Sequence, residues 1–266
     1  MIRLAIALTA LIPLSTFAQA GPAEPPGAGE QPDNDPWTIG LAASVKDSPY
    51  AGEGIQVRPF PWVTYEGERV YWRGVTFGVH LVKTDNFTLD AVVSGRFDGF
   101  DRGDLGRTEL ARNGVDIDRL ADRDDAADAG VAARWAWGGN ELRLRAVADV
   151  TGTSEGYEVS ADYGYRFRIG KTTLIPGIGV QWLSKDLADY YYGVRPGETF
   201  AGTSYRPDAA LVPRASLSFS RPLAGKWRLQ GLLQYQRLPD ELAHSPLLER
   251  NSTAVGHLMI GVVRGF

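Results

Sequence analysis

The residues of this 266-residue chain that are best suited to hydrolytic catalysis are its three histidines, because cysteine is absent. A histidine that contacts both a serine and a carboxylate can activate the serine hydroxyl as a nucleophile. His80 shares the even-numbered face of a predicted strand with Trp72 and Thr76. His244 falls in a predicted loop and His257 in the last predicted strand, and no Gly-x-Ser-x-Gly sequence marks a nucleophile. We therefore predict no catalytic residues, and a hydrolase is the third of three functional hypotheses.

A second group that could do chemistry is the acidic segment 98–128, in which ten carboxylates are interleaved with five arginines. Carboxylate oxygens suit calcium, so the segment could bind a divalent cation or a basic partner. It lacks the Asp-x-Asp-x-Asp-Gly pattern of a calcium loop, and runs of charge are usually solvated. We therefore predict a polar loop whose charges pair with one another, with no metal and no cofactor.

Arginines recur on the polar faces of the predicted strands, where fewer acids accompany them. In a closed sheet these faces would line one interior, where mixed charges can make a selective pore or pair across strands and fill it. We expect a narrow or occluded interior. The charges predicted to line it, if the protein is a channel, are Arg96, Arg134, Arg143, Arg145, Arg166, Arg168, Asp149 and Asp162.

The elements that would position these residues are strands, because apolar and polar residues alternate with a period of two from Trp37 onward. Most of the alternating segments are ten to fourteen residues long. Strands of globular proteins average about five or six residues, whereas a tilted strand needs about nine to eleven to cross a bilayer. The predicted segments are 37–46, 55–65, 69–82, 87–98, 126–137, 140–150, 157–169, 172–183, 209–219, 226–238 and 253–264.

Two architectures suit long strands with one apolar face. One is a soluble sandwich with an apolar core, and the other is a membrane barrel whose apolar face meets lipid. The strand lengths and the aromatic residues near strand ends favour the barrel. We predict an all-β fold, an antiparallel transmembrane β-barrel of 12 strands with 10 as the fallback, from the alternation in the sequence. The twelfth strand is expected from 190–194, or from a strand split at 59–61.

Composition and the first residues of the chain predict export. Lys and Arg number 28 against 32 Asp and Glu, and this net charge of −4 argues against nucleic-acid binding. A positive start, an apolar run and a small-residue cleavage site predict a signal peptide over 1–20. A flexible tail over 21–36 and the barrel over 37–266 would follow. The final residue, Phe266, is predicted to be a signal for assembly into the outer membrane.

Short motifs follow one another along the mature chain in a defined order. They are Ser48-Pro49-Tyr50-Ala51-Gly52, Arg58-Pro59-Phe60-Pro61, Tyr65-Glu66-Gly67, Arg73-Gly74, Arg96-Phe97-Asp98-Gly99-Phe100-Asp101, Tyr191-Tyr192-Gly193-Val194 and Ser245-Pro246-Leu247. As an ordered set they resemble the MipA/OmpV family of outer-membrane proteins over essentially the whole mature chain. The chain departs from the family's Leu-x-Gly-Met run, because it has Leu110-Ala111-Arg112-Asn113 there.

The resemblance implies an outer-membrane β-barrel in contact with lipid. In the family's namesake it also implies a scaffold that joins a lytic transglycosylase to a peptidoglycan synthase, and it supplies no catalytic residues. We therefore expect a location in the bacterial outer membrane. A scaffold for peptidoglycan-remodelling enzymes is the first functional hypothesis. A narrow, porin-like solute channel is the alternative, favoured by the arginine-rich polar faces.

Overall fold

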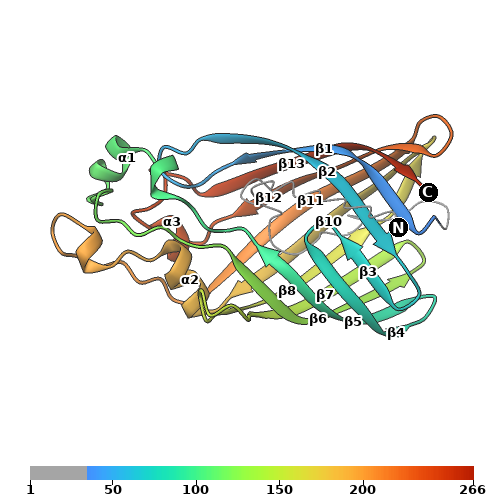
Figure 1. Cartoon of the computed structure of the whole chain (residues 1–266), viewed down its shortest axis with the longest axis horizontal. Helices are drawn as coiled ribbons and strands as arrows, with labels where there is room; N and C mark the ends of the chain where they lie inside the picture. The colour runs from blue at the N-terminus through green and yellow to red at the C-terminus, as the bar shows by residue number, and fades with distance from the viewer. Residues whose placement is uncertain (1–34) are drawn as a thin grey trace, which may run out of the picture.

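One antiparallel sheet closed on itself accounts for most of residues 35–266, which the computed structural model describes (Figure 1). β8 and β9 lie one after the other on the same edge of β10, so they are two parts of one strand. β1 pairs with β13 and β10 pairs with β11, which closes a barrel of twelve strands. The strands are β1 (Trp37–Asp47), β2 (Ile55–Glu66), β3 (Val70–Arg73), β4 (Thr76–Lys83), β5 (Phe87–Arg96), β6 (Ala126–Trp137), β7 (Asn140–Asp149), β8 (Tyr157–Tyr165), β9 (Phe167–Ile169), β10 (Thr172–Leu183), β11 (Ala210–Pro222), β12 (Trp227–Arg237) and β13 (Ala254–Gly265).

The all-β fold and the twelve strands confirm the prediction, but the source of the twelfth strand was predicted wrongly. Segment 69–82 is two strands, because Gly74 adopts a positive φ of 57° and turns the chain between β3 and β4. Segment 190–194 supplies no barrel strand, and β2 runs unbroken through 59–61. The predicted signal peptide, 1–20, and all but the last two residues of the predicted tail, 21–36, lie outside the described residues.

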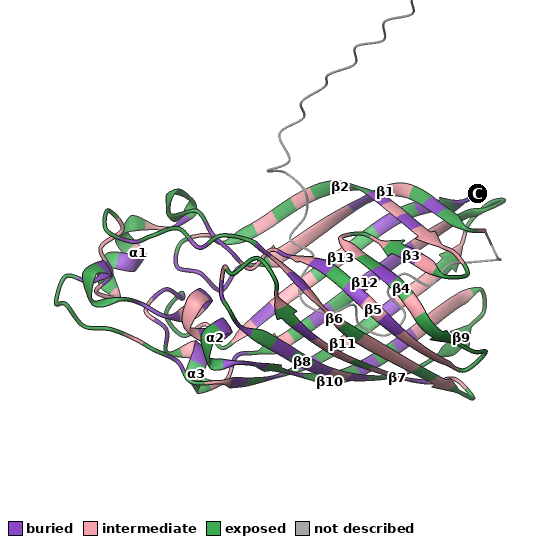
Figure 2. Ribbon diagram, turned by 60° about the horizontal axis from the view of Figure 1, so that its bottom comes forward, coloured by how far each residue is buried: buried purple, intermediate pink, exposed green. Residues whose placement is uncertain are grey.

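Buried and exposed residues alternate along the strands (Figure 2), and the exposed ones are mostly apolar whereas many polar ones are buried inside the barrel. In β8, Tyr157 and Tyr163 are exposed on the outer face, whereas Glu158, Ser160 and Asp162 are buried inside. This alternation is what a lipid-facing barrel requires. Within residues 35–266 the helices are too short and too polar to cross a membrane.

The two ends of the barrel differ in the length of their connections. One end carries only tight turns, and the longest of them is the 223–226 connection. The first and last strands also meet at this end, where the amide of Phe266 donates to the carbonyl of Trp37 at 2.9 Å. We call it the short-turn end. Because Gly74 makes an additional tight turn at the opposite end, the connections alternate regularly from end to end.

The opposite end is closed by a folded layer, the loop cap, formed by 48–54, 97–125, 184–209 and 238–253. It contains α1 (Arg107–Arg112), α2 (Lys185–Tyr192) and α3 (Asp240–Ala243), together with the 3-10 turns η2 (Arg102–Asp104) and η3 (Pro196–Glu198). Side chains from all four loops and the adjoining strand ends form one apolar core, which therefore closes this end of the lumen. That core comprises Tyr50, Ala51, Phe100, Leu105, Leu110, Val115, Leu120, Leu183, Leu187, Ala188, Tyr191, Val194, Ala210, Val212, Leu238, Leu242, Leu247, Leu248 and Val255.

The helix α2 explains why 190–194 does not form a strand. Ser184 precedes the helix, and its Oγ accepts a hydrogen bond from the amide of Leu187, as an N-cap residue does. Leu187, Ala188 and Tyr191 then fall on one helical face and pack into the core of the cap. The three consecutive tyrosines therefore belong to a helix.

The barrel wall has a seam beside β2. β2 pairs with β1 from Ile55 to Tyr65, but it pairs with the short strand β3 only from Thr64 to Glu66. The carbonyl of Val63 accepts a hydrogen bond from the amide of Gly74. The backbone N–H and C=O groups of the odd-numbered residues of β2 therefore point toward β3. Pro59 and Pro61 are also odd-numbered, so the edge of β2 that extends beyond β3 lacks two N–H donors. Proline is expected on an unpaired strand edge, since it offers no N–H donor with which another strand could pair.

Candidate functional site

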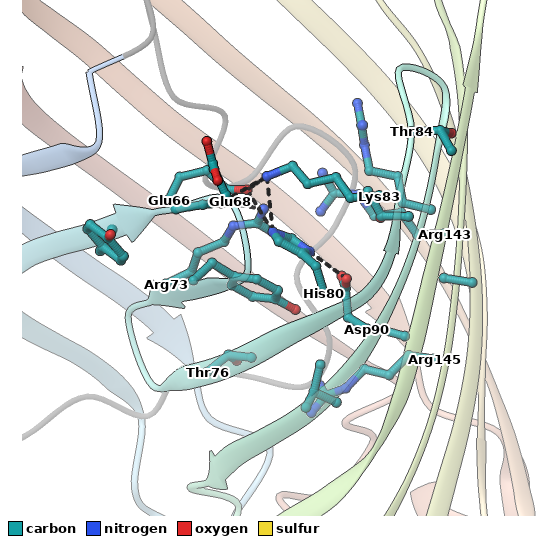
Figure 3. Close-up of a pocket in the computed structure, with 18 of the residues that line it drawn as sticks. Glu66, Glu68, Arg73, Thr76, His80, Lys83, Thr84, Asp90, Arg143 and Arg145 are labelled. Carbon is teal, nitrogen blue, oxygen red and sulfur yellow. Dashed lines mark hydrogen bonds and ion pairs between the residues drawn. The ribbon is translucent and has the colours of Figure 1, made fainter.

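A cavity of about 920 Å³ occupies the short-turn end of the lumen (Figure 3). Its mouth is formed by residues of two tight turns, including Gly67, Glu68, Thr84 and Asp85. Strands β2 to β8 surround it, and their inward side chains give it a polar lining. Because the lining residues come from seven neighbouring strands, only closure of the sheet brings them together.

One side of the cavity is an arginine wall made by Arg134 of β6 and by Arg143 and Arg145 of β7. Arg134 and Arg143 stand directly opposite each other across the two strands. Such a pair of like charges is unfavourable, and the buried Glu141 offsets it: its carboxylate lies 2.8 Å from Arg134 and 2.5 Å from Arg143. Among the residues 35–266, this wall therefore presents three guanidinium groups and the carboxylate of Glu141.

Carboxylates gather on the part of the lining that runs from β2 to β5, and we call this part the acidic wall; it comprises Glu66, Glu68, Asp85 and Asp90, from β2, β5 and two turns. His80 projects from β4 between two of these carboxylates (Figure 3). Its Nδ1 is 2.7 Å from Asp90 and its Nε2 is 3.2 Å from Glu66. Glu66 also accepts from Arg73 at 2.8 Å and from Lys83 at 3.1 Å.

Within residues 35–266, the contacts of His80 do not include a nucleophile. Among the described residues, its ring nitrogens contact Asp90, Glu66 and the ammonium of Lys83, and they contact no serine or threonine hydroxyl. The prediction that His80, Trp72 and Thr76 share one face was also partly wrong. Trp72 points outward, 43% exposed, because the turn at Gly74 reverses the parity of the residues that precede it.

A histidine–serine contact that the sequence did not predict lies nearer the loop cap. His257 Nε2 is 2.7 Å from Ser44 Oγ, between β13 and β1. His257 lines a second cavity of only about 60 Å³, which has room for a few water molecules but is too small for an acyl or glycosyl substrate. This contact could not be predicted from the sequence because the two residues are 213 positions apart. His244 follows α3 in the loop cap.

Buried ion pairs separate the two cavities, which share no lining residue within 35–266. Arg214 and Asp162 form one pair, with side chains 1% and 5% exposed. Arg96 forms a second group with Asp128 at 2.6 Å and Glu158 at 2.8 Å. These charges fill the middle of the lumen.

The other predicted lumen charges lie near the strand ends. Asp149 accepts hydrogen bonds from the amides of Thr151, Ser154 and Glu155, so it holds the turn after β7. Arg166 lies between β8 and β9, 3.9 Å from Glu141. Arg168 is exposed on β9 at the short-turn end, where the ring of Phe266 lies under the Arg264 guanidinium.

Charges of the acidic segment 98–128 pair within the loop cap. Arg107 binds Asp118 through two hydrogen bonds of 2.7 Å. Arg123 is almost fully buried and binds Glu198 at 3.1 Å. Burial raises the pKa of Glu198, but hydrogen bonds from Arg123 and from backbone amides outweigh it and leave that pKa below its ordinary value. In the part of the chain that the structure describes, no three His, Asp or Glu side chains gather as a metal site would need.

Several of the sequence motifs meet inside the loop cap, although they are far apart in the chain. Tyr50 donates to the carbonyls of Asp98 and Tyr191. Ser245 donates to the carbonyl of Tyr192 at 2.6 Å, and Leu247 accepts from the amide of Ala51. The pKa of Tyr50 is raised, first by burial and then by neighbouring phenol and carboxyl groups, so its hydroxyl stays protonated and able to donate.

The chain is similar to several known proteins along most of its length. A family model described as MltA-interacting protein MipA matches residues 39–266. The "MltA-interacting protein" of Escherichia coli strain K12 is 30% identical over 223 residues, which cover 82% of this chain and 86% of that protein. The "Putative outer membrane protein YiaT" of the same strain is 30% identical over 225 residues, covering 81% and 86%.

More distant matches were also found. The "Outer membrane protein OmpV" of Vibrio cholerae is 25% identical over 194 residues, which cover 68% of this chain and 74% of that protein. Among solved structures, the NanC porin aligns with a TM-score of 0.46 at 10% identity, covering 86% of this chain and 100% of the porin.

Proposed function

Because the chain belongs to the MltA-interacting protein MipA family and is an outer-membrane β-barrel protein, we propose that it acts as a scaffold for peptidoglycan-remodelling enzymes. The name of the relative from Escherichia coli supports a lytic transglycosylase as the first partner. A peptidoglycan synthase is the second, and it rests on the family resemblance alone. The observation that carries the proposal is the loop cap. Its apolar core closes one end of the lumen and therefore argues against a wide channel.

The partner surface is the short-turn end. Barrels of this class have short periplasmic turns and longer extracellular loops, so we assign the short-turn end to the periplasm. Enzymes that act on peptidoglycan meet the protein from that side. Arg168 and Lys171 are exposed there beside the turn between β9 and β10 and offer positive charge to a partner.

Affinity capture from detergent-solubilised outer membranes, followed by mass spectrometry, tests the scaffold. We expect a lytic transglycosylase to be enriched with the wild-type protein and reduced with the double variant Arg168→Glu, Lys171→Glu. The matched control is Arg107→Gln, which changes an exposed arginine at the opposite end. If no peptidoglycan enzyme is enriched, or if both variants capture it equally, the scaffold or its assigned surface is wrong.

The second candidate is a narrow solute channel, favoured by the polar cavity of about 920 Å³ and its arginine wall. Purified protein in planar bilayers tests it. We expect no steady conductance of porin size, because ion pairs and the loop cap lie beyond the cavity. Large currents whose selectivity shifts towards cations in Arg143→Gln and Arg166→Gln would overturn the scaffold as the first choice. We propose no catalytic activity.

A further inference from the structure

The walls of the lumen cavity carry opposite charge. On the arginine wall, the three guanidinium groups of the described residues outnumber the carboxylate of Glu141. On the acidic wall, four carboxylates outnumber the two cations, Arg73 and Lys83, that line the same side. A cavity walled by barrel strands is less polarisable than bulk water, so the opposed charges create a field across it. A neutral molecule with separated charges would be oriented by this field.

The inner end of the cavity contains two groups that could bind an anion. Arg145 contacts the hydroxyl of Ser94 but forms no ion pair with a carboxylate of the described residues. Ser160 stands directly opposite Arg145 in the sheet and is only 3% exposed. Ser160 lines the cavity, and its Oγ has no hydrogen-bond partner in the part of the chain that the structure describes. A buried hydroxyl without a partner is costly, so this position favours a ligand that accepts a hydrogen bond.

We propose that the cavity binds short peptides with a free carboxylate and a free ammonium group, entering from the short-turn end. The carboxylate lies between Arg145 and Ser160, because a guanidinium and a hydroxyl both donate to it. The ammonium lies against the acidic wall at Glu68, nearer the mouth. The cavity volume of about 920 Å³ falls within the range of about 300–1,000 Å³ seen for small-ligand sites. This proposal is independent of the scaffold.

Titration calorimetry on the purified, detergent-solubilised protein tests the proposal with trialanine as the probe. N-acetyl-trialanine lacks the ammonium, and trialanine amide lacks the carboxylate. We expect trialanine to bind and each capped peptide to bind about tenfold more weakly, as the loss of one charge-assisted hydrogen bond implies. Arg145→Gln should weaken trialanine binding similarly and remove the preference over the amide. Glu68→Gln should remove the preference over the N-acetyl peptide.

Two controls keep the test decisive. Arg107→Gln alters an exposed arginine in the loop cap and should bind trialanine like the wild type. Ser160→Ala removes only a hydroxyl. It replaces Arg145→Gln as the test of the carboxylate position if Arg145→Gln fails to give the compact, heat-modifiable form of a folded barrel. Absence of trialanine binding, equal binding of the three peptides, or binding of acetate as tight as trialanine would each overturn the proposal. None of these results bears on enzyme capture.

Discussion

Charged residues inside the barrel act mainly by pairing with one another. Arg214 and Asp162 are both nearly inaccessible to water. Removing two charges from water is expensive, and their attraction compensates only while both are present. Sequence patterning placed Asp162 on an inward face, but it did not predict Arg214 as its partner, because the two residues lie 52 positions apart and meet only when the strand register is fixed.

Loss of one partner from this pair should be severe. We expect Asp162→Asn to destabilise the barrel by about 3–5 kcal/mol, because it leaves the Arg214 charge buried without a counter-charge. The matched control is Asp208→Asn, whose partner Lys185 is 60% exposed, and exposed pairs contribute about 0–1 kcal/mol. Urea unfolding followed by tryptophan fluorescence measures both. Similar losses in the two variants would contradict the role of burial.

A second residue-scale prediction concerns acid. The pKa of Glu198 is lowered in the fold, so the folded cap favours the ionised carboxylate. This stabilisation is complete above the ordinary glutamate pKa of about 4.3 and is lost as the pH falls through the lowered value. Hydrogen exchange in 195–206, corrected for intrinsic rates, should therefore accelerate below about pH 4. In Glu198→Gln the exchange should already be fast at neutral pH, and an unchanged profile would refute the assignment.

The period of two predicted the strands well, because every spanning strand has one face toward lipid and one toward the lumen. It missed the β3–β4 turn for a physical reason. Both halves of 69–82 alternate, and the tight turn at Gly74 only reverses which parity points inward. The sequence therefore could not separate one long strand from two short ones. The acidic wall was missed for the same reason, since Glu66 of β2 and Asp90 of β5 meet at His80 only when β3 and β4 are separate strands.

The loss of stability caused by a charge on the outer face should depend on the depth of that charge in the bilayer. We expect Leu144→Arg, near the middle of β7, to cost about 2–4 kcal/mol, because the new charge meets hydrocarbon. Ile169→Arg, on the same outer face but at the short-turn end, should cost about 0–1 kcal/mol. Unfolding of the two proteins in lipid vesicles gives the comparison. Equal costs would show that the assigned membrane position is wrong.

The molecule as a whole consists of a barrel and a loop cap that touch but have separate sources of stability. The barrel depends on its closed hydrogen-bonded ladder, whereas the cap depends on an apolar core assembled from four loops. Within the cap, the backbones of Gly52 and Gly106 approach too closely for side chains. A Cβ at Gly106 would lie 2.9 Å from the Cα of Gly52.

This close approach allows the cap to be disturbed alone. We expect Gly106→Val to loosen the cap and to increase tryptic cleavage at Arg102 and Arg107. Heat-modifiable migration on gels, which reports the closed barrel, should not change. Gly103→Val is the matched control, since a Cβ there has nothing within 4 Å. If Gly106→Val instead abolished the heat-modifiable form, cap and barrel would have to be considered one cooperative unit.

The seam beside β2 has a mechanical consequence. A tube that is slit along part of its length resists ovalisation less than an intact tube, because shear cannot pass across the slit. Here β2 pairs with β3 over only three residues, and the β3–β4 hairpin below the slit also lines the lumen cavity. Lateral compression by the surrounding bilayer is therefore borne unevenly around the circumference. We therefore expect the hairpin wall to yield first, so that the cross-section of the cavity changes with the tension of the surrounding membrane.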